Sequence, residues 1–270
     1  SEVQKYQMIT QTGENVKVVG VKGNFDDTQS GVKKIFTDKE LIQEMAKENL
    51  KFSSANSINW GRLVPQIVYY FSAYADLIKG NRIKVGDKVN FVVPTGNFGN
   101  ILAGYYAKCM GLPVNKLICA SNDNNVLTDF IRTGSYDKRR KFIKTVSPSM
   151  DILISSNLER LLYELTDHDH KKVSDWMNRL NEAGHYEIGQ NLLNRLHKIF
   201  WAGWSNQDET LKTIECVYED NNYILDTHTA VAVDVYDKYV ITTGDLTPSV
   251  ILSTASPFKF NSSVCKALFG

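Results

Sequence analysis

The chain has 270 residues, and 31 lysines and arginines against 30 aspartates and glutamates give it a formal net charge of +1. This balance offers no broad basic surface for nucleic acid, and 43% hydrophobic with 23% charged residues is typical of a folded protein. No apolar run reaches about 18 residues, so we expect no membrane-spanning helix. The N-terminus lacks the apolar stretch and cleavage site of a signal peptide, and it lacks an initiator methionine, which favours a trimmed or partial chain.

The four cysteines are Cys109, Cys119, Cys216 and Cys265, and no two of them form a C-x-x-C pair. Their spacing therefore indicates neither a zinc site nor a redox motif. A chain of this length with an ordinary hydrophobic fraction does not need disulfides for stability. We expect reduced cysteines, no bound metal and a cytoplasmic protein.

The first third of the chain predicts one strand followed by helices. The β-branched run 16–21 predicts a strand. Apolar spacing predicts short helices over 28–36 and 38–48, each preceded or opened by an aspartate that can cap it. Residues 55–59 are polar and turn-like. Residues 62–77 are apolar and aromatic on all sides, which predicts a buried helix.

The strongest local pattern is a strand, a turn, a helix and a second strand in immediate succession. We expect a strand at 88–93, a glycine-containing turn at 95–100, a small-residue helix at 101–110 and a strand at 116–120. This βαβ unit implies a parallel sheet with a right-handed crossover.

Polar helices dominate from residue 122 to residue 220, and the last part returns to an α/β pattern. The expected elements are helices over 157–165, 174–183, 189–201, 208–218 and 227–239 and a short buried strand over 249–253.

We therefore predict an α/β fold, with a mostly parallel sheet flanked by helices and a helical insertion. The expected regions are an α/β phosphate-binding part at 1–121, a mainly helical insertion at 122–220, and a C-terminal α/β segment at 221–270 that completes the first.

The turn from Thr95 to Asn100 is the leading candidate for a binding site. Gly96 and Gly99 let the backbone approach a ligand closely, and the helix that follows presents unpaired N–H groups and a positive dipole end. This combination suits a phosphate group. The turn matches neither the dinucleotide nor the nucleoside triphosphate glycine motif, and a plain strand-to-helix connection remains an alternative.

Four ordered segments closely resemble the threonine synthase family, which depends on pyridoxal 5'-phosphate (PLP) and has the tryptophan synthase β-type fold, PLP fold type II. The resemblance spans nearly the whole chain, and Ser1 to Met8 also looks like an internal family stretch. The segments are Pro94 to Gly104 (PTGNFGNILAG), Ser54 to Asn59 (SANSIN) followed by Arg62, Asp226 to Ala232 (DTHTAVA), and Ser253 to Phe260 (STASPFKF).

The resemblance implies conversion of O-phospho-L-homoserine and water to L-threonine and phosphate, with PLP as the electron sink. It assigns the cofactor phosphate to the backbone of Gly96, Asn97, Phe98, Gly99 and Asn100, and the pyridine nitrogen to Thr254. It makes Asn56, Ser57, Asn59 and Arg62 candidates for the substrate phosphate, for which the planar guanidinium of Arg is well suited.

Each of these assignments has a structural alternative. Residues 56–59 are also typical of a helix-capping turn, Arg62 of an ion pair, and Thr254 of a strand hydroxyl bonded to backbone. His228 fits a helix N-terminus with only local bonds. His168 and His170 are two apart and do not share a helix face, which favours a solvated turn over a metal site.

The resemblance also implies a lysine, in an F-K-D segment, that binds PLP covalently, and an S-G-D-T-G-type segment. The chain contains neither. Lys39 and Lys238 follow an aspartate without the preceding Phe, and Lys259 belongs to the C-terminal motif. Thr227 and Ser256 depart from the family's usual Pro and His. No catalytic residue is therefore assigned, because a PLP enzyme without its lysine loses cofactor attachment and its main base.

We interpret the chain as the C-terminal part of a threonine synthase, inactive by itself, whose partner is the missing lysine-bearing N-terminal domain of the same protein. The alternatives are a non-catalytic PLP- or phosphate-binding relative, and a sibling PLP-dependent dehydratase or phospholyase.

Overall fold

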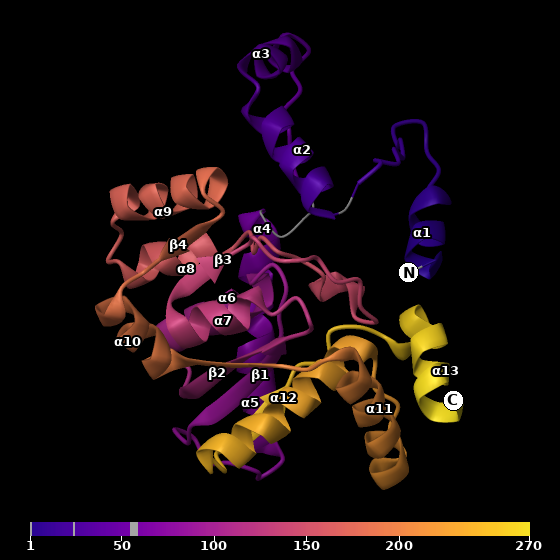
Figure 1. Ribbon diagram of the computed structural model, residues 1–270, viewed down its shortest axis with the longest axis vertical. Coiled ribbons are helices and arrows are strands. Elements are labelled where there is room, and N and C mark those ends of the chain that lie inside the picture. The colour runs from indigo at the N-terminus through magenta and orange to yellow at the C-terminus, as the bar shows by residue number, and fades with distance from the viewer. Residues whose placement is uncertain (1, 24, 55–58) are drawn as a thin grey trace.

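The protein is described by a computed structural model that covers residues 2–23, 25–54 and 59–270 (Figure 1). Its centre is a sheet of four parallel strands in the order β5-β2-β1-β6, and β3 and β4 form a separate antiparallel pair. The strands are β1 (Val89–Pro94), β2 (Val114–Ser121), β3 (Ser135–Asp137), β4 (His185–Glu187), β5 (Phe200–Trp204) and β6 (Ser249–Ile251).

Helices make up most of the rest of the described chain. They are α1 (Glu2–Ile9), α2 (Phe25–Thr37), α3 (Lys39–Lys47), α4 (Trp60–Leu63), α5 (Ile67–Lys79), α6 (Gly99–Cys109), α7 (Val126–Thr133), α8 (Leu158–Leu165), α9 (His170–Glu182), α10 (Gln190–Ile199), α11 (Gln207–Asn221), α12 (Thr227–Thr243) and α13 (Asn261–Phe269), with 3-10 turns at Val64–Gln66, Pro148–Met150 and Pro257–Phe260.

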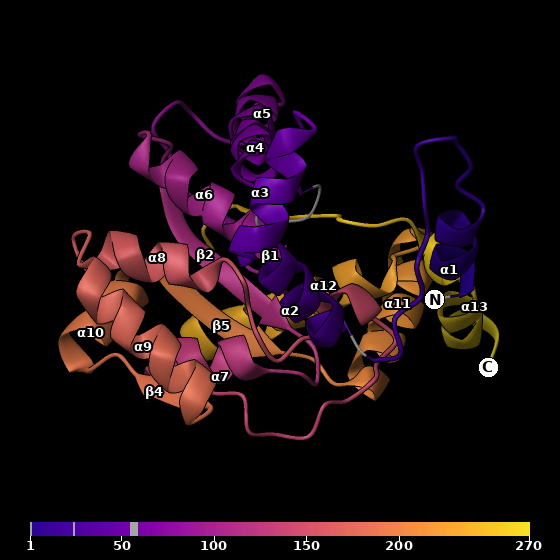
Figure 2. The same cartoon turned by 90° about the horizontal axis from the view of Figure 1, so that it is seen from above.

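Side chains alternate along the central strands and so build a core on each face of the sheet. Phe91 and Val93 of β1 pack with α6, α7, α8 and α10, whereas Val92 packs against α12. Helices α8 to α10 gather on one side of the sheet and α11 to α13 on the other (Figures 1 and 2). The prediction of a mostly parallel sheet flanked by helices is confirmed.

The predicted βαβ unit is also confirmed, since β1 and β2 pair in parallel with α6 between them in sequence. The helix predicted for 189–201 ends at Ile199, and β5 follows at once and pairs with β2. A strand of the central sheet therefore lies within the segment 122–220, and the proposed division of the chain at 121 and 220 stays a prediction.

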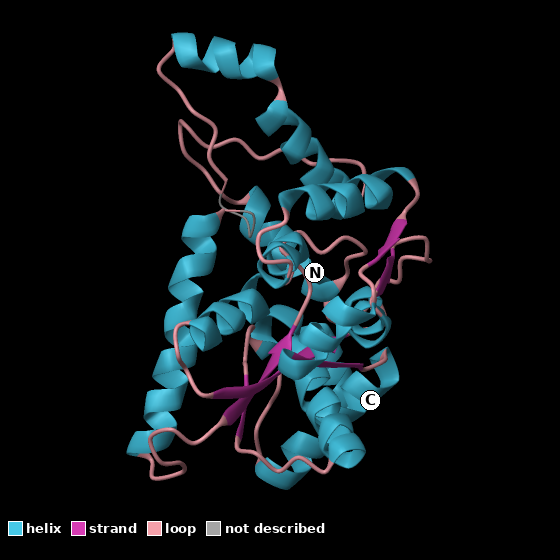
Figure 3. Cartoon of the chain, turned by 90° about the vertical axis from the view of Figure 1, so that its left-hand side faces the viewer, coloured by secondary structure: helices cyan, strands magenta, loops and turns pink. Residues whose placement is uncertain are grey.

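The strand predicted for 16–21 is wrong for this chain. The segment is exposed and belongs to no strand of the described structure. A strand needs a neighbour to satisfy its backbone, and the described residues provide none here. Helices were predicted correctly at α2 and α3, and Asp38 caps α3 as expected, but α2 begins at Phe25, so Asp26 and Asp27 lie within the helix and not before it. Both helices stand away from the sheet (Figures 1 and 3).

The helix predicted over 62–77 is divided into α4, a 3-10 turn and α5, and the expectation that it is buried all round is wrong. Tyr70 and Tyr74 are buried, but Val68, Tyr69 and Phe71 are exposed, because only one side of α5 packs against α6. The strand predicted over 249–253 is shorter, and β6 is half-buried because it forms the edge of the sheet.

Candidate functional site

Parallel pairing brings two distant motifs to one edge of the sheet. Val92 of β1 is the register partner of Ile251 of β6, so the two strands end side by side. The glycine turn leaves the carboxyl end of β1, and the segment with Thr254 leaves the carboxyl end of β6. Ligands of open α/β sheets bind at this edge.

The glycine turn has an unusual backbone at Phe98, which adopts φ 62° and ψ 6° immediately before α6. A left-handed conformation at a residue with a bulky side chain costs about 1–3 kcal/mol and persists only where the surroundings enforce it. Here the Phe98 ring is buried and packs on Phe200 with ring centroids 5.8 Å apart. The core therefore sets the direction in which α6 begins.

The turn leaves a row of backbone donors without acceptors. In the described part of the chain, the N–H groups of residues 96–100 donate to no carbonyl or side chain, whereas Thr95 N–H bonds to the Ala120 carbonyl at 2.8 Å. These donors lie at the N-terminus of the 11-residue helix α6, where the helix dipole is positive. The arrangement suits a bound anion.

Carbonyl groups of the turn are instead held from the opposite side by the segment that precedes α8. The Ser155 hydroxyl donates to the Gly96 carbonyl at 2.9 Å. Asn157 donates to the Asn97 carbonyl through its backbone N–H at 3.1 Å and through its side chain at 2.8 Å. These bonds turn the carbonyls away from the free N–H groups.

Tyr70, on α5, braces Asn100, the second residue of α6. Its hydroxyl contacts the Asn100 carbonyl oxygen at 2.8 Å and the Asn100 side-chain oxygen at 2.9 Å. Burial raises the pKa of Tyr70, so the phenol stays protonated and donates. Helices α5 and α6 come close enough for this contact because Gly104 has no side chain: a Cβ there would lie 2.7 Å from the Tyr70 ring.

Two cavities open along this edge. One, of about 380 Å³, is lined by the glycine turn with Ser149. The other, of about 640 Å³, reaches Tyr69, Ser253 and Thr254. Arg62, Gln66 and Asn100 line both cavities, so the two adjoin.

The structure thus brings Gly96, Asn97, Phe98, Gly99, Asn100, Arg62 and Thr254 together. The Thr254 hydroxyl is exposed and forms no hydrogen bond within the described residues. Asn59 lines neither cavity. Its side-chain oxygen accepts the Gly61 N–H at 2.8 Å and its amide donates to the Ser54 carbonyl, so it caps α4. Asn56 and Ser57 lie outside the described residues.

No lysine is among the described residues that line these two cavities. Lys259 lies instead on a separate cavity of about 470 Å³, together with Lys144. Lys238 contacts Glu209 at 2.9 Å and Asp234 at 2.7 Å. Among the residues that the structure covers, no cluster of three metal-binding side chains occurs, and no helix has the length and apolar character needed to span a bilayer.

His228 lies in the first turn of α12 and is 2% exposed. Asp226 caps this helix and accepts the His228 N–H at 2.8 Å. Burial by itself raises the pKa of Asp226, but hydrogen bonds from His228 and Thr229 outweigh it and hold the pKa below its ordinary value. His168 is exposed, 3.1 Å from Glu164, as expected for a solvated turn.

Sequence reasoning missed the residues that hold the turn: Tyr70, Ser149, Ser155 and Asn157. Tyr70 is 30 residues from its partner Asn100, and Ser155 is 59 residues from Gly96. The one signal in the sequence was the polar run Ser-Ser-Asn at 155–157, just before an apolar helix. That signal was ambiguous, because such a run is also typical of a helix start.

The chain is similar to known proteins over nearly all of its length. The family model described as "Threonine synthase, C-terminal" matches residues 229–270. The chain is 47% identical to human "Threonine synthase-like 1", over 99% of the chain and 36% of that protein. It is 41% identical to threonine synthase of Saccharomyces cerevisiae, over all of the chain and 54% of that protein.

A solved structure of PLP-bound threonine synthase from Brucella melitensis superposes with a TM-score of 0.85 at 42% identity, over 99% of this chain and 55% of that one. The chain spans about half the length, or less, of the relatives that it matches. Both the sequence identity and the superposition extend over nearly all of the chain. The chain is therefore homologous to a part of these threonine synthases and shares the fold of that part.

Proposed function

We propose that this chain forms the PLP-binding part of a threonine synthase, which converts O-phospho-L-homoserine and water to L-threonine and phosphate. The observation that carries the proposal is the pair of adjoining cavities that joins the glycine turn, Arg62 and Thr254. PLP acts in such enzymes as an electron sink for carbanions, and the protein binds and orients it.

The glycine turn fits the phosphate group of PLP. Five successive N–H groups at the start of α6 have no acceptor among the residues that the structure describes, and they offer donors and a positive dipole end to a doubly charged anion. The carbonyl of Gly96 is held away from this space by Ser155. The donors are therefore fixed before the anion arrives, which lowers the entropic cost of binding.

Thr254 fits the opposite end of the cofactor. Its hydroxyl is without a partner in the described residues and lines the cavity that adjoins the turn. A neutral hydroxyl can donate to an unprotonated pyridine nitrogen, whereas a carboxylate would favour the protonated ring.

Arg62 is our main candidate for the substrate phosphate, because it lines both cavities and its planar guanidinium can donate two parallel hydrogen bonds. Gln66 lies one helical turn further and lines the same space. Asn56, Ser57 and Asn59 stay predictions for this role. The side chain of Asn59 already caps α4, so we rank it below Arg62.

The lysine that holds PLP is proposed to come from a further part of a longer polypeptide. Two features support this. The relatives are about twice as long as this chain or longer. The β-branched run 16–21 and the outer faces of α2 and α3 are exposed, with Val19 81% and Ile35 46% accessible, which suits a segment that packs on more chain. The cytoplasmic location stays a prediction from the sequence.

The test compares the 270-residue chain with the polypeptide extended at its N-terminus by the coding sequence upstream. Phosphate release from O-phospho-L-homoserine is measured with PLP present. We expect turnover from the extended polypeptide and none from the chain alone. Turnover by the chain alone, or an extended polypeptide that binds PLP but releases no phosphate, would contradict the proposal.

A further inference from the structure

We propose that His228 is a positioning residue for the cofactor site. Its ring accepts a hydrogen bond from the Ser149 N–H, and Ser149 in turn packs against Gly96 and fixes the glycine turn. This inference rests on the proposed function only in naming PLP as the ligand. It assigns a role to a histidine that touches neither of the two cavities described above.

The contact to Ser149 determines the protonation of the His228 ring. Nε2 of His228 lies 3.1 Å from the backbone nitrogen of Ser149. A backbone N–H can only donate, so Nε2 must be an unprotonated acceptor. The single ring proton is then on Nδ1, which lies 3.1 Å from Oδ1 of Asp226.

Asp226 fixes this ring orientation. It accepts from the His228 N–H, from the Thr229 N–H at 3.3 Å and from the Thr229 hydroxyl, besides the ring Nδ1–H. The carboxylate is 2% exposed and its pKa is held low, so it stays an acceptor. A buried, fully bonded carboxylate of this kind holds an imidazole in one tautomer and one orientation.

On its far side, Ser149 packs directly against the glycine turn. A Cβ at Gly96 would lie 2.9 Å from the Ser149 carbonyl oxygen and 3.3 Å from the Met150 Cα, so the two backbones are in contact. Ser149 also lines the cavity at the turn. Any displacement of Ser149 is therefore transmitted to Gly96 without an intervening side chain.

The loop that carries Ser149 has a second attachment at Asp151. This buried carboxylate accepts hydrogen bonds from the Asn122 amide at 2.8 Å, the Asn124 amide at 3.0 Å and the Thr145 hydroxyl at 2.7 Å. Asp151 thus ties the loop to the end of β2, and His228 ties it to α12. The 3-10 turn Pro148–Met150 is therefore attached at its central residue, Ser149, and at the residue that follows it, Asp151.

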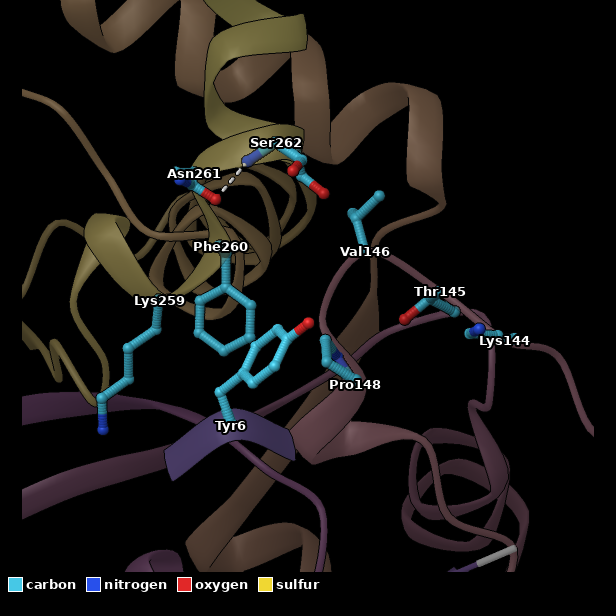
Figure 4. Close-up of a pocket in the computed structure, with 10 residues that line it drawn as sticks. Tyr6, Lys144, Thr145, Val146, Pro148, Lys259, Phe260, Asn261 and Ser262 are labelled. Atoms are coloured by element: carbon cyan, nitrogen blue, oxygen red, sulfur yellow. Dashed lines mark hydrogen bonds between the residues drawn. The ribbon is translucent and has the colours of Figure 1, made fainter. Parts of the chain in front are cut away.

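His228 also contacts the segment that presents Thr254. Its ring lies 4.6 Å from the Phe260 ring, centroid to centroid. Phe260 and Pro148 line the same cavity, where Figure 4 shows them with Tyr6. One histidine therefore contacts both the loop that packs on the glycine turn and the end of the segment that carries Thr254. The glycine turn and Thr254 are the two elements proposed to hold opposite ends of PLP.

The experiment uses the 270-residue chain, ¹⁵N-labelled, with amide and histidine resonances recorded before and during titration with PLP. His228→Asn and His228→Phe remove the acceptor that faces Ser149. His228→Gln places an amide oxygen near the position of Nε2. His197→Gln is the matched control, because the His197 ring also bonds to backbone, at the Ile131 carbonyl 2.7 Å away, but outside the site.

We expect the wild-type His228 ring to carry its proton on Nδ1. The Asn and Phe variants should shift the Ser149 and Gly96 amide resonances and weaken PLP binding about tenfold, the size of one lost hydrogen bond at the upper end of its range. The Gln variant should stay within about threefold of wild type, as should the control.

A protonated Nε2 in wild type would overturn the inference. So would Asn and Phe variants that keep the wild-type Gly96 resonance and PLP affinity. A wild-type chain that binds no PLP counts against the proposed function instead, and the ring tautomer and the Gly96 resonance still decide the role of His228.

Discussion

Val92 of β1 and Ile251 of β6 are register partners in adjacent parallel strands. Their pairing explains why two motifs about 150 residues apart in sequence meet at one site: each motif begins two or three residues beyond one of these partners. The glycine turn and Thr254 are therefore positioned by the sheet itself. Both proposed binding elements are loops, and the pairing of β1 with β6 determines the distance between them.

Gly96→Ala should damage the anion site. Its new Cβ would lie 2.9 Å from the Ser149 carbonyl oxygen, a backbone atom that is held in place. We expect a loss of stability of about 1–3 kcal/mol and at least tenfold weaker PLP binding. Urea unfolding and PLP titration measure the two effects.

Gly31→Ala is the matched control for this substitution. Gly31 lies in α2 with nothing within 4 Å of the new Cβ, so alanine should leave PLP binding unchanged and raise helix stability by up to about 1 kcal/mol. Equal PLP affinities in both variants would remove Gly96 from the site.

Tyr70→Phe removes the hydroxyl that bonds to Asn100. We expect a loss of about 1 kcal/mol in the free energy of unfolding, together with weaker PLP binding, because the first turn of α6 loses its brace. Tyr74→Phe is a close match on the same helix: its hydroxyl bonds to Gly86 and Asp87, away from the site. It should lose similar stability and bind PLP normally, and an equal effect of both variants on binding would argue against a specific role for Tyr70.

Arg62→Ala, made in the extended polypeptide, should raise KM for O-phospho-L-homoserine about tenfold or more, since a charge-assisted bidentate contact to a phosphate is lost. Arg82→Ala, at an exposed position beyond the end of α5, provides the control and should leave KM unchanged. Steady-state kinetics give both values. An unchanged KM in the Arg62 variant would remove it from the substrate site.

Acid should destabilise the chain partly through Asp245. Burial raises its pKa, but hydrogen bonds from Thr247 and Tyr239 outweigh burial and hold the pKa well below its ordinary value. A depressed pKa in the folded state means that this stabilisation is complete above the unfolded value of about 3.9 and is lost as the pH falls below it. Unfolding free energies measured between pH 6 and acid should fall less steeply for Asp245→Asn; identical slopes would contradict the assignment.

Local patterns predicted the βαβ unit well, because strand, turn and helix there depend on neighbours in sequence and on apolar periodicity. The cap at Asp38 and the stop after Lys47 were local in the same way. Predictions were less accurate where an element needs a partner that is distant in sequence. Residues 16–21 have the composition of a strand, but the described structure offers no strand to pair with them.

The candidate site was predictable only where its residues belong to motifs. Gly96, Arg62 and Thr254 could be named from the sequence, although their proximity depends on the pairing of β1 with β6. The contacts that brace the site could not be predicted from the sequence. Ser149 and His228 are 79 residues apart, and Ser149 contributes only a backbone N–H to their hydrogen bond. No residue type at position 149 signals that contact.

The central claim is that the N–H groups of residues 96–100 bind the phosphate of PLP. A crystal structure of the 270-residue chain soaked or co-crystallised with PLP tests it most directly. We predict the phosphate on these five N–H groups and the pyridine nitrogen within hydrogen-bond distance of the Thr254 hydroxyl. PLP held instead in the cavity with Lys144 and Lys259, with an empty glycine turn, would contradict the account.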